Sequence, residues 1–501
     1  MTSSAAYNRE DVTARSTSRT SQIFLRIFRS IPVLLVLLAL RPAHAQNSAA
    51  AATAGNGHIL LVLPFDNFTT PQPSSGEAAT AVGDSNLSSL DWLREAAPEV
   101  LNSRFTSAGF LPLTREDRLY ALDHLGLPET FQPSRATALR IAETLDANYI
   151  LIGSYSVSGT TLNLKARIVD VAKLRISEDI TQSGPIAQLI PLLNTLAWKL
   201  TRKLDPSFNV AEETFRVAGS GVHLDAFEQY IRGLTEHDVA ERLRHLKKAT
   251  DLNADFTAAW LATGKLQFAS QQYEQAAVSF GKVTQGNPDE LEAGFYRGLS
   301  LIFSGNYPRA EEAFANVARV LPLPEVVNNE AVAMSRRGRD ASALFRQAEA
   351  ADPTDADYHF NLAVSLHSHG DKAEALTELA QSLKLRPNDS EAKAAEAAWK
   401  PERTQTTNPI ERIKRSYNGA AFRQAAQMMD QMEQVHLASL SGPERAARLS
   451  KSAREKLNRG LLLEAEHGFQ AALAADSGNT DARTGLTQVR ERAGTIESTR
   501  K

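Results

Sequence analysis

The sequence predicts an α+β multidomain protein, with an amino-terminal mixed α/β domain followed by an all-α solenoid of helical hairpins. Between residues 58 and 205, short apolar runs alternate with segments of helical period, which is typical of an α/β domain. After residue 224 the pattern is helical throughout, and similar residues recur at a fixed spacing. A chain of 501 residues is also too long for one compact core, so more than one domain is expected.

The first domain begins with an apolar run of the length of a buried strand. Further on, Leu162, Leu164 and Ala166 alternate with polar residues, which predicts a half-buried strand. A glycine at the end of a helical stretch, Gly109, marks a helix end. We expect strands at 58–65, 110–113, 148–157, 161–169 and 175–180, and helices at 89–107, 115–125, 134–145 and 186–204.

The helical region repeats itself. Gly264 recurs as Gly298 and Ala276 recurs as Ala310, each 34 residues on, and the third repeat is three residues short. Small residues let the two helices of a hairpin approach closely, an aromatic residue fills the gap to the next hairpin, and a proline ends the second helix. One hairpin cannot bury its apolar face alone, but a stack can. The repeat-packing residues are Gly264, Ala276, Phe280, Pro288, Gly298, Ala310, Phe314, Pro322, Ala341, Phe345, Pro353, Ala375, Pro387, Ala465 and Phe469.

Composition shifts and the repeats define the expected organisation. Gly, Ser and Pro gather between the patterned regions, and similarity to the regular repeats fades on either side of them. We expect a signal peptide (1–45), a flexible linker (46–57), the α/β domain (58–205), a linker (206–223), a degenerate first hairpin (224–256), about four regular repeats (257–399), a linker (400–409), a second, looser helical block (410–492) and a tail (493–501).

The amino terminus has the pattern of a secretory signal. Arg26 and Arg29 precede an apolar run at 31–40, and the small-x-small pattern at 43–45 predicts cleavage after Ala45. A run of ten residues is short for a membrane-spanning helix, which needs about 20, although a retained anchor stays open as an alternative. The chain has no cysteine, which excludes disulfides and a lipoprotein's lipidated cysteine. We expect an exported, periplasmic protein.

The repeats resemble the tetratricopeptide repeat family over about residues 257–388. In that family the first helix of each hairpin lines a concave face, so the resemblance implies a groove for a protein or peptide partner. Asn329 and Asn361 stand at one groove position of the third and fourth repeats, and their amides suit the backbone of an extended peptide. The alternative is that both asparagines brace the stack by bonding to neighbouring helices. Candidate peptide-binding residues are Asn328, Asn329, Asn361, Leu261, Lys265, Phe295, Tyr296 and Phe360.

The first domain carries a second resemblance. The run Leu-Pro-Phe-Asp-Asn at 63–67, Leu-Asp-Trp-Leu at 90–93, and the strands at 147–155 and 162–170 resemble the amino-terminal-like domain of the translocation protein TolB. The same domain type occurs in FlgO-like flagellar outer-membrane assembly proteins. Proteins with this domain often carry tetratricopeptide arrays and act at the bacterial envelope, so the resemblance implies a place there.

No familiar catalytic constellation is present in the sequence. It contains no Gly-x-x-x-x-Gly-Lys-Ser/Thr phosphate loop, His-Glu-x-x-His or Gly-x-Ser-x-Gly motif. His359 and His367 could share a helix face, but solvent-exposed histidines explain them better than a metal site. The formal net charge of -3 shows no basic excess for nucleic acid. We therefore expect neither enzyme activity nor a cofactor.

Two functions fit these patterns. The first is an exported scaffold or adaptor that binds other proteins through a concave groove, in envelope assembly or transport. The alternative is an oligomeric structural subunit of an outer-membrane secretion or assembly complex.

Overall fold

The computed structural model describes residues 58–69, 90–129, 134–217, 221–283, 289–400, 409–417 and 419–499. The expected signal peptide at 1–45, the linker at 46–57 and Pro288 lie outside these residues. The chain divides into two compact units. We call the described residues of 272–277 and 291–426 the array unit, and those of 49–271, 278–290 and 427–501 the sheet unit.

A seven-stranded mixed sheet organises the sheet unit. The strand order is β3-β1-β4-β5-β6, with β2 also beside β4 and β7 also beside β5. β1 runs parallel to β3 and β4, whereas β4 and β5 form a long antiparallel pair. The strands are β1 (Ile59–Val62), β2 (Asp66–Asn67), β3 (Leu111–Pro112), β4 (Tyr149–Ser158), β5 (Thr161–Asp170), β6 (Arg175–Ile176) and β7 (Ile180–Pro185).

The strand predicted at 175–180 is wrong, because two strands, β6 and β7, stand there. Both pair with β5, and the chain between them has no regular structure from Ser177 to Asp179. The Oγ of Ser177 accepts a hydrogen bond from the N–H of Ile168 (2.9 Å). That hydroxyl replaces the bond that a continuous strand would have made. The period of the sequence cannot reveal such a break.

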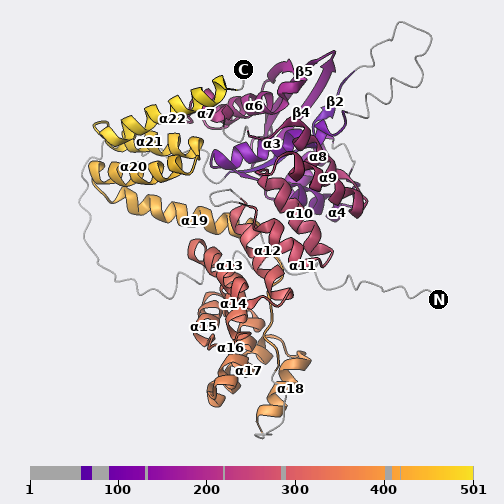
Figure 1. Ribbon diagram of the computed structural model, residues 1–501, viewed down its shortest axis with the longest axis vertical. Helices are drawn as coiled ribbons and strands as arrows, with labels where there is room; N and C mark the ends of the chain where they lie inside the picture. The colour runs from indigo at the N-terminus through magenta and orange to yellow at the C-terminus, as the bar shows by residue number, and fades with distance from the viewer. Residues whose placement is uncertain are drawn as a thin grey trace, which may run out of the picture. The chain divides into compact units, whose positions relative to one another are not determined.

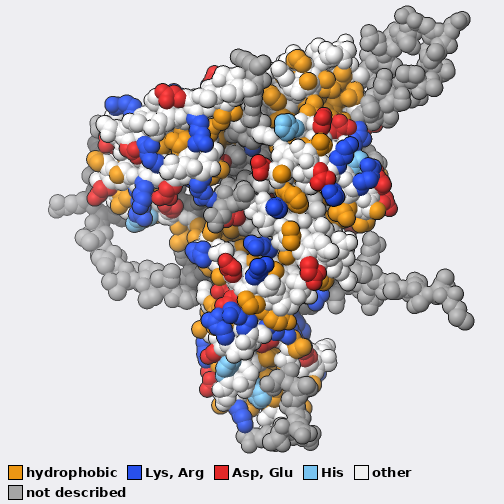
Figure 2. All heavy atoms as spheres, viewed as in Figure 1, with side chains coloured by type: hydrophobic (Ala, Val, Ile, Leu, Met, Phe, Trp, Pro, Cys, Tyr) orange, Lys and Arg blue, Asp and Glu red, His pale blue; other side chains and the backbone are white. Residues whose placement is uncertain are grey.

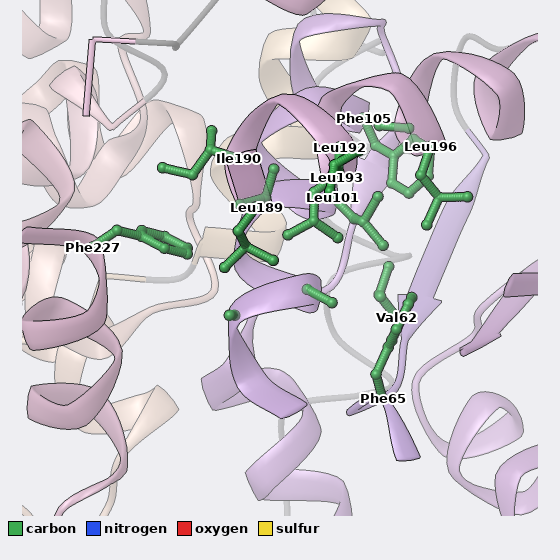
Figure 3. Packing of buried hydrophobic residues seen from close by; sticks show 14 of the residues in the cluster. Val62, Phe65, Leu101, Phe105, Leu189, Ile190, Leu192, Leu193, Leu196 and Phe227 are labelled. Carbon is green, nitrogen blue, oxygen red and sulfur yellow. The ribbon is translucent and has the colours of Figure 1, made fainter. Parts of the chain in front are cut away.

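Helices cover both faces of the sheet. Because side chains alternate along a strand, Leu60 and Val62 of β1 face one core and Leu61 and Leu63 face another. Figure 3 shows part of the first core, in which apolar side chains of α3, α6 and α8 belong to one cluster with Val62. The helices of the sheet unit are α3 (Leu93–Ser107), α4 (Arg115–His124), α5 (Arg135–Thr144), η1 (Ile186–Gln188), α6 (Leu189–Leu204), α7 (Glu212–Val217), α8 (Leu224–Thr235), α9 (Val239–Leu252), α10 (Thr257–Ala269), α20 (Gly442–Asn458), α21 (Leu462–Ala475) and α22 (Thr480–Ser498).

The linker predicted at 206–223 is corrected by the structure, which places a helix within it. Residues 212–217 form α7, whose Phe215 is fully buried. Just before α7, the indole N–H of Trp198 donates to the carbonyl of Val210 (3.0 Å). Glycines at 219 and 221 indicated a linker, but the apolar residues before them reach a core that is distant in sequence.

The hydrophobic core continues across the domain boundary predicted at residue 205. Phe227 of α8 lies against Trp92 of the α/β domain in an edge-to-face contact (6.3 Å), and the Tyr230 hydroxyl donates to Glu99 (3.1 Å). Ala259 of α10 belongs to the same core. The first hairpin and α10 are therefore part of the sheet unit, and the predicted array at 257–399 is divided between the two units.

The array unit is built from helical hairpins that follow one another (Figure 1). The aromatic and small residues of the repeat lie buried between helices, whereas Pro322, Pro353 and Pro387 are exposed in turns, where they end helices. Ala341 comes just before the short helix of the shortened repeat. The helices are α12 (Glu290–Phe303, from its second residue on), α13 (Tyr307–Val320), α14 (Pro324–Ser335), α15 (Ser342–Ala351), α16 (Ala356–His369), α17 (Lys372–Leu385) and α18 (Ser390–Trp399). Two further helices, α11 (Tyr273–Phe280) and α19 (Gly419–Ala438), belong to both units in part.

In the hairpin of α12 and α13, a glycine packs directly against an aromatic ring. A Cβ atom added at Gly298 would stand 2.6 Å from the Phe314 ring, which is far inside van der Waals contact. Gly298→Ala should therefore lower the free energy of unfolding by about 1–2 kcal/mol, because overpacking outweighs the helix propensity of alanine. Gly494→Ala is the matched control, since this glycine of α22 has open space around it. It should raise stability by up to about 1 kcal/mol. Thermal melts followed by circular dichroism would check both signs, and a gain for both variants would contradict close packing at Gly298.

The described surface is mixed in sign. Figure 2 shows Lys and Arg side chains interspersed with Asp and Glu over the face in view. Among the helices that the structure describes, none is long and apolar enough to cross a membrane.

Candidate peptide groove

Residues 409–417, with the sequence Pro-Ile-Glu-Arg-Ile-Lys-Arg-Ser-Tyr, lie along the array unit without helical structure. We call them the basic segment. They run beside α14 and α16 (Figure 1) and are held there by side chains of both helices. At its amino end, Glu411 accepts a hydrogen bond from the Ser335 hydroxyl and pairs with Arg336 (3.3 Å). The predicted helical block at 410–492 is therefore wrong for residues 410–417.

Two asparagines bind the backbone of the basic segment. The N–H of Arg412 donates to Asn361 Oδ1 (2.6 Å), and Asn361 Nδ2 donates back to the Arg412 carbonyl (2.7 Å). Asn329 makes the same pair of bonds with Lys414, at 2.8 and 2.7 Å. In an extended chain, residues two apart turn their N–H and C=O groups to the same side. The asparagines therefore hold the segment as a neighbouring strand would.

The asparagines are fully buried. Asn328, Asn329 and Asn361 have no exposed area, and Asn328 Nδ2 also donates to the Arg412 carbonyl (3.0 Å). Asn361 donates to Asn328 Oδ1 as well (2.8 Å), which links α16 to α14. The same residues therefore bond to the backbone of the basic segment and brace the stack. A buried amide without partners costs about 1–3 kcal/mol, so the segment satisfies groups that water would otherwise have to reach.

Arg412 enters a cluster of carboxylates. Its guanidinium forms two parallel bonds with Asp389 (2.7 and 2.8 Å) and single bonds with Asp357 (3.0 Å) and Glu391 (3.1 Å). The same group lies 3.7 Å above the centre of the Phe360 ring. A planar guanidinium suits both contacts, because it matches the carboxylate fork and stacks on an aromatic face.

Lys414 occupies the next site along the groove. Its ammonium contacts Asp355 (2.7 Å) and Asp357 (2.8 Å) and lies 4.8 Å from the centre of the Tyr358 ring. Asp357 therefore bridges the two cations. Arg412 and Lys414 point to the same side because they are two residues apart in an extended chain.

The charges of the site stabilise one another. Burial alone would raise the pKa of Asp357, but Lys414 and Arg386 outweigh it and hold that pKa well below its ordinary value. The pKa of Asp389 is also lowered, because hydrogen bonds from Arg412 outweigh burial. Burial would lower the pKa of Arg412, yet its carboxylate partners raise it. All three groups therefore stay charged at neutral pH.

The carboxyl end of the basic segment rests on aromatic rings. Tyr417 lies 5.6 Å from Phe295 and 6.1 Å from Tyr296, measured between ring centres. Arg415, which is exposed, lies over Phe303 (5.0 Å). Helix α12 thus supplies an apolar end to a groove that is acidic along α16 and α18.

The structure gathers six of the eight candidate residues and leaves out two. Asn328, Asn329, Asn361 and Phe360 contact Arg412 or Lys414, and Phe295 and Tyr296 contact Tyr417. The predicted place of Leu261 and Lys265 in this groove is corrected, because α10 belongs to the sheet unit. Leu261 is buried there, and Lys265 pairs with Glu116 (3.2 Å).

Neither half of the charged contact was predicted from the sequence. Arg412 and Lys414 alternate around Ile413, a strand-like signal that three residues are too short to establish. Asp355, Asp357 and Asp389 stand at or beside helix starts, where acidic residues are common for capping alone. The available signal was a group of acidic residues at the starts of two successive hairpins together with a short basic run further along the chain.

The predicted exposure of the histidines is wrong for His359. That ring is buried, with Nδ1 2.7 Å from Glu378 and Nε2 3.2 Å from the Pro353 carbonyl. His367 is stacked on Trp399 (4.1 Å) and only half-buried. Within the described ranges, no group of three His, Cys, Asp or Glu side chains could hold a metal ion.

Comparisons with known proteins identify the repeat. Residues 329–390 match the family model of the tetratricopeptide repeat. Among solved structures, YrrB, described as a tetratricopeptide protein with an unusual peptide-binding site, is 18% identical, with 34% of this chain and 92% of that chain covered and a TM-score of 0.33. A tetratricopeptide protein of Thermus thermophilus is 17% identical over 35% and 98% (TM-score 0.26), and the LpoB carboxy-terminal domain from Escherichia coli is 20% identical over 27% and 87% (TM-score 0.18). A search of curated proteins found no match.

Proposed function

Because residues 329–390 match the tetratricopeptide repeat family, we propose that this chain is a non-catalytic scaffold whose groove binds extended segments of other proteins. The two-point bonds from Asn329 and Asn361 carry the proposal. They bind the backbone N–H and C=O of the bound residues. Every extended segment can offer both groups, unless proline, which has no N–H, stands at one of the two bound positions. Affinity thus comes from the backbone, and the side-chain contacts are left to decide which segment binds.

The test is a full-length chain in which residues 409–417 are replaced by a Gly/Ser linker of equal length, which we call the cleared chain. A fluorescent peptide with the sequence of residues 409–417 should bind the cleared chain. Asn329→Ala with Asn361→Ala should weaken this binding at least about tenfold, because four hydrogen bonds are lost at about 0.5–1.5 kcal/mol each. Asn458→Ala, an exposed asparagine of α20, is the matched control. Unchanged binding in the double variant would sink the backbone-recognition proposal.

We also propose that the scaffold works in the bacterial envelope, after export and cleavage at Ala45. The charged, apolar and small-x-small pattern of residues 26–45 supports export, and the resemblance of the first domain to the TolB type supports the envelope. In this proposal the α/β domain docks to an envelope component while the groove holds a second protein. Cell fractionation and the amino-terminal sequence of the mature protein test the location. A cytoplasmic chain that keeps residues 1–45 would refute it.

A further inference from the structure

We propose that the basic segment is a built-in competitor for its own groove, and that the partner is an extended peptide with two basic residues separated by one residue. This inference rests on the proposed function, since it names the ligand class and the regulation of that groove. The partner must displace residues 409–417 before it can bind.

The contacts of the basic segment are those of a ligand. It joins neither the sheet nor a helix, and its contacts run through side-chain amides, ion pairs and ring faces of α12, α14, α16 and α18. Each contact depends on a chemical feature that another segment could also provide. Two asparagines bind the backbone, two groups of carboxylates bind the cations at 412 and 414, and the aromatic rings of α12 contact the ring at 417.

Charge decides which segment the groove accepts. Asp355, Asp357, Asp389 and Glu391 all contact Arg412 or Lys414. Without these cations, four carboxylates would stand close together, with Arg386 as a remaining partner of Asp357 (2.7 Å) and Asp389 (3.6 Å). An acidic segment would add like charge and a neutral one would leave the carboxylates uncompensated, so the groove selects a basic pattern.

The spacing of that pattern follows from the extended backbone. Arg412 and Lys414 reach the carboxylates, whereas Ile410 is 58% exposed, so the groove does not select the residue type at that position. Tyr417 follows Lys414 by three residues and reaches the rings of α12. The recognised pattern is therefore basic-x-basic-x-x-aromatic, in which the basic pair carries the charge selection.

Covalent linkage makes the competition strong. A ligand on a short tether acts at an effective concentration in the millimolar range. If the free peptide binds an open groove at about 1–10 μM, the tethered copy weakens binding of a free copy by about 10²–10³-fold. A partner therefore needs extra contacts or a high local concentration to open the groove.

The experiment compares the wild-type chain, the cleared chain, and a full-length chain carrying Arg412→Glu with Lys414→Glu. Two fluorescent peptides serve as probes: one with the sequence of residues 409–417, and the same peptide carrying both Glu substitutions. By fluorescence anisotropy, the native peptide should bind both altered chains about 100-fold or more tighter than the wild-type chain. The charge-reversed peptide should bind none of the three.

The outcomes separate this inference from the proposed function. Equal binding of the native peptide to wild-type and cleared chains would overturn the competition, and the groove would still be a peptide site. Equal binding of both peptides to the cleared chain would overturn the basic pattern. Absence of peptide binding to both altered chains, with helix content kept by circular dichroism, would overturn the proposed function as well. The double-Glu chain differs from the wild type at only two residues, so it decides the question if the cleared chain does not fold.

Discussion

Arg412→Glu should release the basic segment from the groove. The substitution removes the guanidinium from Asp357, Asp389 and Glu391 and places a fourth carboxylate among them. Breaking one side of a fully buried charge pair costs about 3–5 kcal/mol, so the loss of Arg412 from this half-buried cluster should cost roughly 3 kcal/mol, which is about 100-fold in the release of the segment. Hydrogen exchange measured by mass spectrometry should show that protection of residues 409–417 falls by at least about 100-fold.

Arg415→Glu is the matched control for that prediction. It makes the same change of charge three residues further on, but the Arg415 side chain is exposed and contacts the Phe303 ring rather than the carboxylates. The segment should stay protected in this variant. Equal loss of protection in the two variants would mean that net charge, rather than the contacts of Arg412, holds the segment.

The sheet unit should lose stability as pH rises from about 5 to 8. Burial, reinforced by the nearby charges of Glu116 and Glu95, raises the pKa of Glu99 to about 7, although the Tyr230 hydroxyl and Arg118 act in the opposite direction. The folded state therefore keeps a proton on Glu99 that the unfolded chain releases near its ordinary pKa of 4.5. The contribution is fully present below pH 4.5 and is lost as pH rises through 7, with an upper limit of about 3 kcal/mol.

Glu99→Gln should flatten this pH dependence. Glutamine keeps the shape of the protonated side chain and its neutral charge, so the variant should be more stable than the wild type at pH 8 and close to it at pH 5. Urea unfolding followed by hydrogen exchange in α3 measures this region separately from the array unit. Glu143→Gln, an exposed carboxylate of α5, is the matched control and should keep the wild-type slope. The same slope in Glu99→Gln would refute the assignment to Glu99.

Local pattern was enough to predict most of the elements. Strand β5 is visible as alternation from Leu162 to Ile168, because one face of a half-buried strand must be apolar. The hairpins are visible because a glycine and the aromatic ring that it packs against, such as Gly298 and Phe314, recur at the same spacing in the preceding repeat. The break between β6 and β7 and the helix α7 escaped prediction, because each depends on a partner outside its own stretch of sequence.

The groove was predicted from one side only. The asparagine amides at 329 and 361 could be placed on a concave face because the repeat defines helix positions. Their ligand could not be found, since Asn361 and Arg412 are 51 residues apart and no local rule joins them. The short run Ile-Glu-Arg-Ile-Lys-Arg is compatible with a helix by composition, and only the acidic groove holds it extended.

By itself, the sequence determined the helical hairpins, the mixed α/β region and the polar amides available along the array. Those features follow from spacing along the chain, because burial of one face and close helix contact require particular residues at particular intervals. Tertiary structure alone decided where the two compact units divide and which segment lies in the groove. Both depend on contacts between residues far apart in the chain, where charge and shape meet only after folding.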